Sequence, residues 1–489
     1  MITFRILLSS LIATLVVGCG GGGIDSSVPA PGASTPPPTA GVDCGQTRLK
    51  QSVLETARDW YLFPELLPTS IDPALYANVD DFLDALTATA RAQSKDRFFS
   101  YTTSIATENA LLQGSSAGFG VSFLARSNPN SLFIGQVFEG SAAADAGLAR
   151  GDEILAIGTS VATLQNIAQI AASSGGLSAA LGPSTVGESR TFRWRNLAGV
   201  VTDRSITKRN FEINPVPASS VRVLTTASGT RVGFFTLRSF VSDPGQSGQP
   251  VELAALRNAF SLFAAQNVQN VIIDLRYNGG GLVSIAELML NLLAGDQVGQ
   301  VSYANRLNTR QSAQNDTRRF TRQPQTLPTR RVAFLVTQQS ASASELVINS
   351  SVPYIKTAVI GTRSFGKPVG QFAFDVSACD FRLRLIAFKT VNRNDDGDYF
   401  TGFPYPAFTN AGGVACAASD DLTRAPGDPA EGLTASALAW IGSANATCPA
   451  AAIALEPDKA AALAPAEKSL DLLDSRPRDA LQAYLPGTY

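Results

Sequence analysis

The sequence predicts a mixed α/β (α+β) protein of several domains, and three observations support this fold class. Residues 46–112 carry apolar side chains at helical spacing, and residues 113–213 have the pattern of short strands separated by glycine turns. From residue 215 onward, strands alternate with helices, which favours a core with parallel strands. The length of 489 residues is enough for two or three domains.

Shifts in composition divide the chain into six segments. We expect a signal peptide over residues 1–18, a flexible tether over 19–43, an N-terminal helical domain over 44–112, a β-rich domain over 113–213, an α/β core over 214–425 and a C-terminal helical extension over 426–489. The tether consists mainly of Gly, Ser, Pro and Ala with almost no charge, as flexible linkers do. The extension gives no indication of function.

The first residues have the pattern of a bacterial export signal. Arg5 gives a positive start, residues 6–17 form an apolar core, and residues 16–19 (Val-Val-Gly-Cys) have the form of a lipobox. The apolar stretch is shorter than the roughly 20 residues that a membrane-spanning helix needs. We expect lipid attachment at Cys19, the alternative being a simple signal peptide with a chance cysteine. Gly20 after this cysteine favours the outer membrane, so the expected location is the periplasmic face of a bacterial envelope.

The composition excludes several classes of site. The chain contains no histidine, which rules out a Ser-His-Asp triad and any metal site built on imidazole. The net charge of −1 gives no reason to expect nucleic acid, and we interpret the Arg-rich stretch 318–322 as a solvated face. Residues 361–367 have the pattern of a phosphate-binding loop, but Pro368 stands where the Ser or Thr that binds magnesium is needed. Residues 392–398 have the pattern of the start of a calcium-binding loop, but Phe403 stands where the bidentate glutamate is needed. We expect no cofactor and no metal.

Four cysteines remain after the signal segment: Cys44, Cys379, Cys416 and Cys448. In an oxidising compartment they suggest two disulfides with three possible pairings. The sequence favours Cys379–Cys416 and Cys44–Cys448, because each pair flanks a plausible compact unit.

A cluster of small hydroxyl residues follows the apolar strand predicted at residues 331–336. It is Ser340-Ala341-Ser342-Ala343-Ser344-Glu345, which suits a nucleophile on a strand-to-helix turn. Without histidine, the proton of such a serine must go to a lysine or a carboxylate.

Lys367, after a second apolar strand, is the candidate base. A lysine with the ordinary pKa near 10.4 is protonated at neutral pH, so burial must lower its pKa. Phe365, Val369 and Phe372 are the local apolar candidates for such a pocket, and Gln371 can orient the amine.

Two glycine-rich stretches predict backbone binding sites. Residues 277–282 (Tyr-Asn-Gly-Gly-Gly-Leu) lie between a buried strand and a helix, as in an oxyanion hole. Residues 118–121 (Gly118, Phe119, Gly120, Val121), followed by Ala-Gly-Leu at 146–148 and Gly-Asp-Glu-Ile-Leu at 151–155, resemble a PDZ domain. That resemblance implies capture of a peptide C-terminus by backbone N–H groups, the alternative being a β-rich domain that binds no peptide.

Taken together, these segments resemble the carboxyl-terminal processing (tail-specific) serine proteases, a family with a Ser-Lys dyad and a PDZ domain. The resemblance implies Ser342 as nucleophile, Lys367 as base and Gln371 as its support, with Ser340 or Ser344 as alternative nucleophiles. Residues 274–281 match the family's oxyanion loop, which implies the backbone N–H groups of Gly280 and Ala343 as oxyanion donors. The core is then expected to be similar to the crotonase and tricorn folds.

The chain departs from the family pattern at three positions. Ser364 replaces threonine, Pro368 replaces glycine and Gly279 replaces proline, and none of these changes removes a reacting group. Glu345, which opens the following helix, is expected to be a structural residue matched to the helix dipole.

The sequence therefore predicts an exported, lipid-anchored serine endopeptidase. Its expected partners are protein or peptide substrates with exposed C-termini, and the membrane through the N-terminal anchor, but not nucleic acid. The main alternative is a non-catalytic envelope lipoprotein that binds peptides or polymer. A third reading, acyl chemistry on a small substrate, is disfavoured because a small substrate has no tail for a PDZ domain.

Overall fold

The computed structural model describes residues 43–125, 131–243 and 253–448. Its central sheet has the strand order β10-β11-β12-β15-β16-β19, in which β11 to β19 are parallel and β10 is antiparallel to β11. The bounds are β10 Arg222–Thr225, β11 Arg231–Thr236, β12 Asn270–Asp274, β15 Arg331–Val336, β16 Lys356–Gly361 and β19 Val414–Ala417. The alternation of strands and helices thus gives the expected parallel core.

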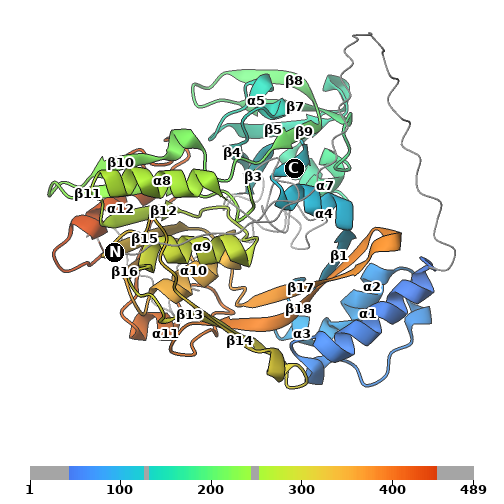
Figure 1. Cartoon of the computed structure of the whole chain (residues 1–489). Helices are drawn as coiled ribbons and strands as arrows, with labels where there is room; N and C mark the ends of the chain where they lie inside the picture. The colour runs from blue at the N-terminus through green and yellow to red at the C-terminus, as the bar shows by residue number, and fades with distance from the viewer. Residues whose placement is uncertain (1–42, 126–130, 244–252, 449–489) are drawn as a thin grey trace, which may run out of the picture. The chain divides into compact units, whose positions relative to one another are not determined.

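Helices cover both faces of this sheet. On one face, α8 (Ala254–Ala265), α9 (Val283–Ala294) and α10 (Ala343–Ser351) pack against side chains such as Phe235 and Phe334 (Figure 1). On the other face, α12 (Gly432–Gly442), from the predicted C-terminal extension, packs against neighbours of these residues such as Phe234 and Leu335. Successive strand residues point to opposite faces and both faces are buried, which explains the unbroken apolar runs in the sequence.

A second sheet joins the N-terminal segment to the core. In it β1 pairs with β18, β18 with β13, β13 with β14, and β17 also pairs with β18. The bounds are β1 Tyr101–Ser104, β13 Val301–Leu307, β14 Asp316–Arg319, β17 Val369–Val376 and β18 Phe381–Val391. The helices α1 (Gln46–Trp60), α2 (Val79–Leu86) and α3 (Ala88–Ala92) belong to an apolar cluster that includes residues of β17 and β18. The N-terminal helical domain therefore shares its core with this sheet.

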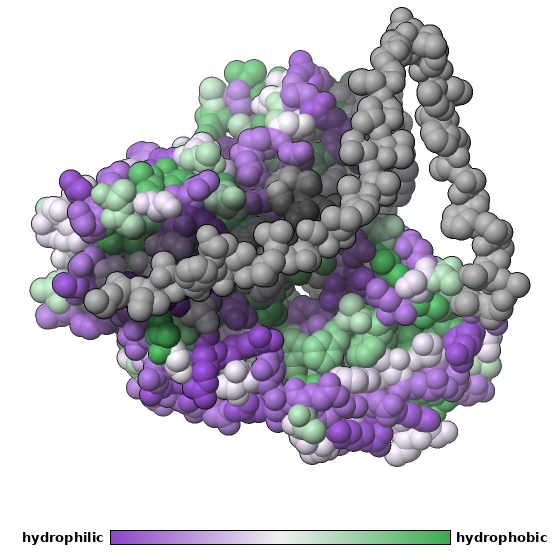
Figure 2. All heavy atoms as spheres, in the orientation of Figure 1, coloured by the Kyte–Doolittle hydropathy of each residue, from purple (hydrophilic) through white to green (hydrophobic). Residues whose placement is uncertain are grey.

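Apolar side chains also remain partly exposed along β17 and β18. Figure 2 shows hydrophobic residues over the region that Figure 1 labels with these two strands. Phe372 and Phe374 on β17 are half-buried.

The β-rich region forms a separate sheet with the order β3-β4-β5-β7-β8, and the short strand β6 pairs with β5. The bounds are β3 Val121–Ala125, β4 Leu132–Val137, β5 Glu153–Gly158, β6 Gln165–Asn166, β7 Ser189–Arg195 and β8 Val201–Thr207, with α5 Ala142–Ala146, α6 Ile167–Ala172 and α7 Gly176–Leu181. Before it, α4 (Ile105–Leu112) leads into β2 (Ser115–Gly118), which pairs with β9 (Arg209–Glu212). Because β2 precedes this sheet and β9 follows it, the two chain segments that connect the β-rich region to the rest of the protein lie side by side.

The predicted disulfide pairing is wrong. The structure has Cys44–Cys379 and Cys416–Cys448. Cys44 lies just before α1, which packs near the β17–β18 hairpin, and Cys379 lies in the turn of that hairpin. Cys448 follows α12, which covers the sheet edge formed by β19, where Cys416 lies. Tertiary packing, not the spacing of cysteines along the chain, decides which sulfurs meet.

The signal segment, the tether and the lipid-attachment position Cys19 lie outside the described residues. Within the described ranges, none of the helices is both long and apolar enough to cross a membrane.

Candidate active site

Ser342 lies at the turn between β15 and α10. It precedes the first residue of α10 and has φ 57° and ψ −114°. Side chains of L-residues rarely allow positive φ, so this backbone is strained, as is common at functional sites. Ser342 is half-buried, whereas Ser340 and Ser344 are buried and donate to the carbonyls of Leu275 (2.8 Å) and Asn278 (3.0 Å). Of the three serines, Ser342 is therefore the one with a hydroxyl suited to attack.

Glu345 connects the Ser342 turn with the Lys367 segment. Its carboxylate accepts hydrogen bonds from the backbone N–H groups of Ser342 (3.0 Å), Gly366 (2.6 Å) and Lys367 (2.7 Å). It also accepts from the hydroxyl of Ser364 (2.6 Å). Burial raises the pKa of Glu345, and these donors oppose that effect because they need carboxylate lone pairs. Glu345 is thus more than a helix-opening residue, since it fixes the backbones of Ser342 and Lys367 relative to one another.

Lys367 lies between β16 and β17, and its amine donates to Oε1 of Gln371 at 3.1 Å. The Phe99 ring centroid lies 5.3 Å from Nζ, and the Phe99 carbonyl accepts from Nε2 of Gln371. Burial lowers the pKa of Lys367 to about 8, partly offset by the negative charge of Asp96. Lys367 and Gln371 therefore meet as the sequence predicts, and the lysine is tuned toward the range in which it can act as a base.

The glycine loop approaches the serine as closely as its sequence suggests. A Cβ atom placed on Gly280, which has φ +109°, would lie 2.8 Å from Cβ of Ser342 and 3.0 Å from the Ala343 nitrogen. Ala343 is the first residue of α10, where N–H groups lack partners within the helix. The Gly280 N–H, however, donates to Oδ1 of Asn278 at 2.9 Å. To bind an oxyanion, Gly280 must exchange this contact for the substrate.

The predicted peptide-binding residues, Gly118 to Val121, are buried against the start of α5. The Phe119 carbonyl accepts from the Ala143 N–H at 3.0 Å, and a Cβ on Gly120 would lie 2.1 Å from Cβ of Ser141. Glycine is required at position 120, where φ is +78°.

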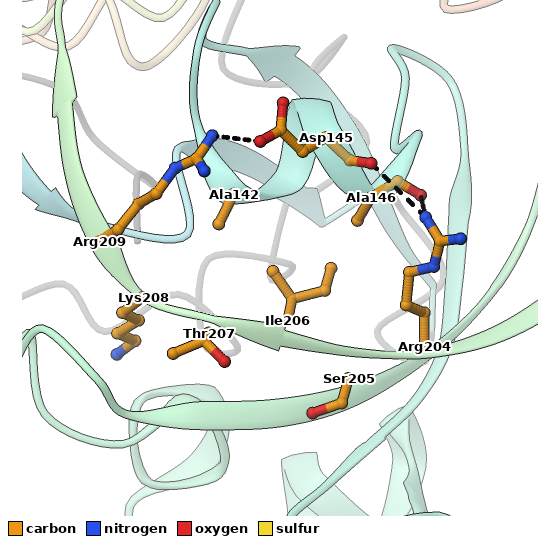
Figure 3. Close-up of a pocket in the computed structure, with 9 residues that line it drawn as sticks. All are labelled: Ala142, Asp145, Ala146, Arg204, Ser205, Ile206, Thr207, Lys208 and Arg209. Atoms are coloured by element: carbon orange, nitrogen blue, oxygen red, sulfur yellow. Dashed lines mark hydrogen bonds and ion pairs between the residues drawn. The ribbon is translucent and has the colours of Figure 1, made fainter.

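A pocket of about 410 Å³ lies between α5, β8 and the start of β9. Figure 3 shows Arg209 and Arg204 bound to α5: Arg209 pairs with Asp145 (2.5 Å), and Arg204 donates to the Ala146 carbonyl (3.0 Å). Because the guanidinium groups of both Arg204 and Arg209 already contact α5, the pocket does not offer two unpaired arginines to a negatively charged ligand.

The other loops singled out in the sequence have structural contacts. Oδ1 of Asn392 accepts from the N–H groups of Asn394 (2.9 Å) and Asp396 (3.2 Å), so residues 392–396 form a self-bonded turn. Among the described residues, no group of three His, Cys, Asp or Glu side chains is arranged to hold a metal ion.

Sequence reasoning missed three contributors to this site. The spacing of Ser342 and Glu345, three residues apart, is that of a capping box and could have indicated the Glu345 contact. Asn278 holds the oxyanion loop through Gly280 and through the Leu237 carbonyl (2.8 Å). The contribution of Phe99 had no local signal, because it comes from a distant part of the chain.

Comparison with known proteins shows which family this chain resembles. Residues 231–398 match peptidase family S41, and residues 48–101 match the peptidase S41 N-terminal domain. The chain is 26% identical over 288 residues to the carboxyl-terminal-processing protease of Synechocystis sp., covering 58% of this chain and 60% of that protein. It is 31% identical over 119 residues to the carboxy-terminal-processing protease of Bartonella bacilliformis, covering 23% of this chain and 25% of that protein.

A solved structure shows the same similarity. A Bacteroides fragilis protein assigned to the S41 proteases superposes with a TM-score of 0.60 and 25% identity, covering 80% of this chain and 96% of that one. The matches to the two processing proteases above span no more than 60% of their lengths. Ser342 and Lys367 lie within the S41 match, together with the loop that approaches the serine. Two segments of the chain, residues 48–101 and 231–398, therefore match peptidase S41 domains, and the chain is similar to proteases of that family.

Proposed function

We propose that this protein is a lipid-anchored serine endopeptidase that binds the C-terminal tails of its substrates and cuts them with a Ser342–Lys367 dyad. The observation that carries the proposal is the pair of links from Lys367: Gln371 holds its amine, and Glu345 holds its backbone together with that of Ser342. Such an arrangement matches a nucleophile and a base held on one rigid support.

The reaction proceeds through an acyl-enzyme. Oγ of Ser342 attacks the substrate carbonyl while its proton passes to Nζ of Lys367, and the backbone N–H groups of Ala343 and Gly280 stabilise the oxyanion. The C–N bond then breaks, and Lys367 returns the proton to the leaving amine. Water attacks the ester with Lys367 again as base, which releases the acid and restores Ser342.

Residues 113–213 supply the proposed recognition of tails, as a PDZ domain. The glycine loop at 118–121 leads directly into β3, an edge strand of the β-rich sheet in the described residues. An extended peptide can add to such an edge with its carboxylate near the loop. The contacts of this loop with Ala143 and Ser141 engage the carbonyls of Phe119 and Gly120 and not its N–H groups.

Export and anchoring through Cys19 complete the proposal. The Cys44–Cys379 and Cys416–Cys448 disulfides support an oxidising compartment. Membrane fractionation tests the anchor: Cys19→Ser should move the protein from the membrane fraction to the soluble fraction of the envelope.

Cleavage of a loosely folded test protein with an apolar C-terminal tail tests the activity. We expect cutting by the wild-type chain, and loss of more than a hundredfold in Ser342→Ala and in Lys367→Ala. Lys356→Ala, at an exposed lysine that starts β16, is the matched control and should cut at the wild-type rate. If the tail binds but neither the wild type nor any variant cuts the test protein, the protein is instead a non-catalytic, peptide-binding envelope lipoprotein.

A further inference from the structure

Residues 96–100, between α3 and β1, lie against the Lys367 segment although they are far from it in the sequence. Nη2 of Arg97 donates to the carbonyls of Phe365 and Gly366, both at 2.7 Å, across a separation of 268 residues or more. The guanidinium carbon also lies 4.4 Å from the Phe365 ring centroid. Arg97 therefore holds the two residues that immediately precede Lys367.

Phe99 acts on Gln371 through its backbone. Its carbonyl accepts from Nε2 of Gln371, while Oε1 of the same amide accepts from Lys367 at 3.1 Å. An amide held at both ends has a defined orientation, with its oxygen toward the amine. If the amide turned over, its N–H groups would face the lysine and the contact would be lost.

Asp96 fixes the backbone around Phe99, whose carbonyl orients Gln371. Its buried carboxylate accepts from the N–H groups of Phe99 (2.8 Å) and Ser100 (3.1 Å) and from the hydroxyl of Ser100 (2.8 Å). The hydroxyl of Tyr61 donates a further bond at 2.9 Å. A carboxylate with this many partners leaves the Phe99 carbonyl little freedom to move.

Charged groups from several elements face the Lys367 amine. They are Asp96 beside α3, Glu345 on α10, Arg384 on β18 and Glu108 on α4. Asp96 has the largest effect of these charges and raises the pKa of Lys367, against the larger lowering by burial, while Arg384 lowers it. Asp96 thus acts on the amine by its charge as well as through Phe99.

We propose that Asp96, Arg97 and Phe99 are positioning residues for the Ser342–Lys367 dyad, so that the N-terminal domain completes the active site of the core. Arg97 holds the segment before Lys367, and Asp96 fixes the Phe99 carbonyl that orients Gln371. The proposal rests on the proposed function, because orienting the amine serves catalysis only if Lys367 takes a proton.

Asp96→Asn tests the charge without removing the hydrogen-bond acceptor, since the amide oxygen can still accept from the Phe99 and Ser100 N–H groups. The titration of the Lys367 amine is followed by NMR in protein labelled at lysine Cε and Nζ, with the signal assigned by its absence from Lys367→Met. We expect the midpoint to move to lower pH by about half a unit or more, because a stabilising negative charge is lost. An unchanged midpoint in folded Asp96→Asn would show that the Asp96 charge does not act on the amine, and the positioning role is then decided by Arg97→Met.

Asp80→Asn is the matched control for this charge change. Asp80 is an exposed carboxylate on α2 of the same domain and accepts from the Thr102 hydroxyl. We expect the midpoint of the Lys367 amine in Asp80→Asn to equal that in the wild type. The NMR titration needs no turnover, so it decides whether the Asp96 charge acts on the amine even if the wild-type chain fails to cleave and the proposed function falls.

Arg97→Met tests the contact of Arg97 with the Lys367 segment. It also provides an independent test of the proposal if Asp96→Asn does not fold. We expect kcat to fall about tenfold or more with KM within twofold of wild type, because the base is displaced while substrate contacts stay. Arg91→Met removes a nearby arginine that pairs with Asp84 instead, and it should leave kcat unchanged. An unchanged kcat in folded Arg97→Met would contradict the proposal.

Discussion

At the scale of single residues, Lys367 combines its proposed role as a base with a cost in stability. Its amine lies near the Phe99 ring and is held by Gln371, and burial lowers its pKa from 10.5 to about 8. At pH 7 roughly a tenth of the molecules then carry the neutral amine, compared with fewer than one in a thousand for a free lysine. The folded state binds this proton more weakly than the unfolded state does, so protonation at neutral pH opposes folding.

Replacing Lys367 with methionine should therefore stabilise the protein while abolishing cleavage. The pKa change corresponds to roughly 3 kcal/mol, and we expect a gain of about 2 kcal/mol at pH 7 because the residue is partly exposed. The wild type gains stability as pH rises from 8 to 10.5, where only the unfolded state still binds the proton, so the difference should fade by pH 10.5. Urea unfolding at the two pH values measures this. Lys356→Met, at an exposed lysine, should change stability by less than about 0.5 kcal/mol at either pH, and a loss of stability in Lys367→Met at pH 7 would refute the argument.

At the scale of elements, the two disulfides join segments of very different separation. Cys44–Cys379 links the start of α1 to the β17–β18 turn over 335 residues, and Cys416–Cys448 links β19 to the segment after α12 over 32 residues. The first bond therefore fastens the N-terminal domain, with residues 96–100, to the sheet that carries Gln371.

Removing the long-range disulfide should cost more stability than removing the short-range one. Restricting a longer loop takes more entropy from the unfolded chain, and the difference for these separations is about 2 kcal/mol. Chemical unfolding of Cys44→Ala/Cys379→Ala beside Cys416→Ala/Cys448→Ala measures it. We also expect the first double variant, and not the second, to lose cleavage activity at temperatures well below its unfolding. Equal stability and equal activity of the two would contradict the argument.

At the scale of the whole molecule, a buried charge network joins the β-rich region to the core. Arg276, after β12, contacts Asp274 (2.9 Å), Asp420 (2.7 Å) and Glu431 (3.0 Å), and Glu431 caps the start of α12. Arg150 of the β-rich region also pairs with Asp420. The network ties three segments together at Arg276, which immediately precedes the glycine loop at residues 277–281.

This network predicts a loss of stability in strong acid. Burial alone would raise the pKa of Asp420, but Arg276 and Arg150 lower it to about 2 from 3.8. Its stabilisation, about 2 kcal/mol, is present above pH 3.8 and is lost as pH falls through 2. Between pH 5 and pH 2 we expect Asp420→Asn to lose about 2 kcal/mol less than wild type, measured by chemical unfolding. Asp59→Asn, an exposed partner of Arg310, should follow wild type, and parallel curves for Asp420→Asn would rule out this role.

The sequence and the structure agree where a motif lies at the end of a local element. Residues 331–336 form the strand that precedes Ser342, as their apolar pattern predicts. Lys367 and Gln371 are only four residues apart, so their spacing was enough to predict the contact between them. The mixed α/β, multidomain fold class is confirmed for the same reason, because each strand and helix carries its own pattern.

The remainder depended on contacts between distant segments. Nothing near Lys367 indicates that Asp96 and Phe99, some 270 residues earlier, would lie against it. The disulfide pairing failed because α1 packs on the β17–β18 hairpin, a fact of tertiary structure. The Gly280 N–H was expected to be free, but the side chain of Asn278, two residues before it, occupies it. Local patterns cannot specify such contacts.

The positive φ at Ser342 also limits which residues can replace this serine during evolution. Threonine, the other hydroxyl residue, is branched at Cβ, and a branched side chain at φ 57° is strained well beyond the level that serine tolerates. Cysteine has the unbranched shape of serine and meets no added backbone strain. Lineages that arise from this chain can therefore exchange the proposed alcohol nucleophile for a thiol in one step, whereas threonine at this position would require the turn itself to be rebuilt.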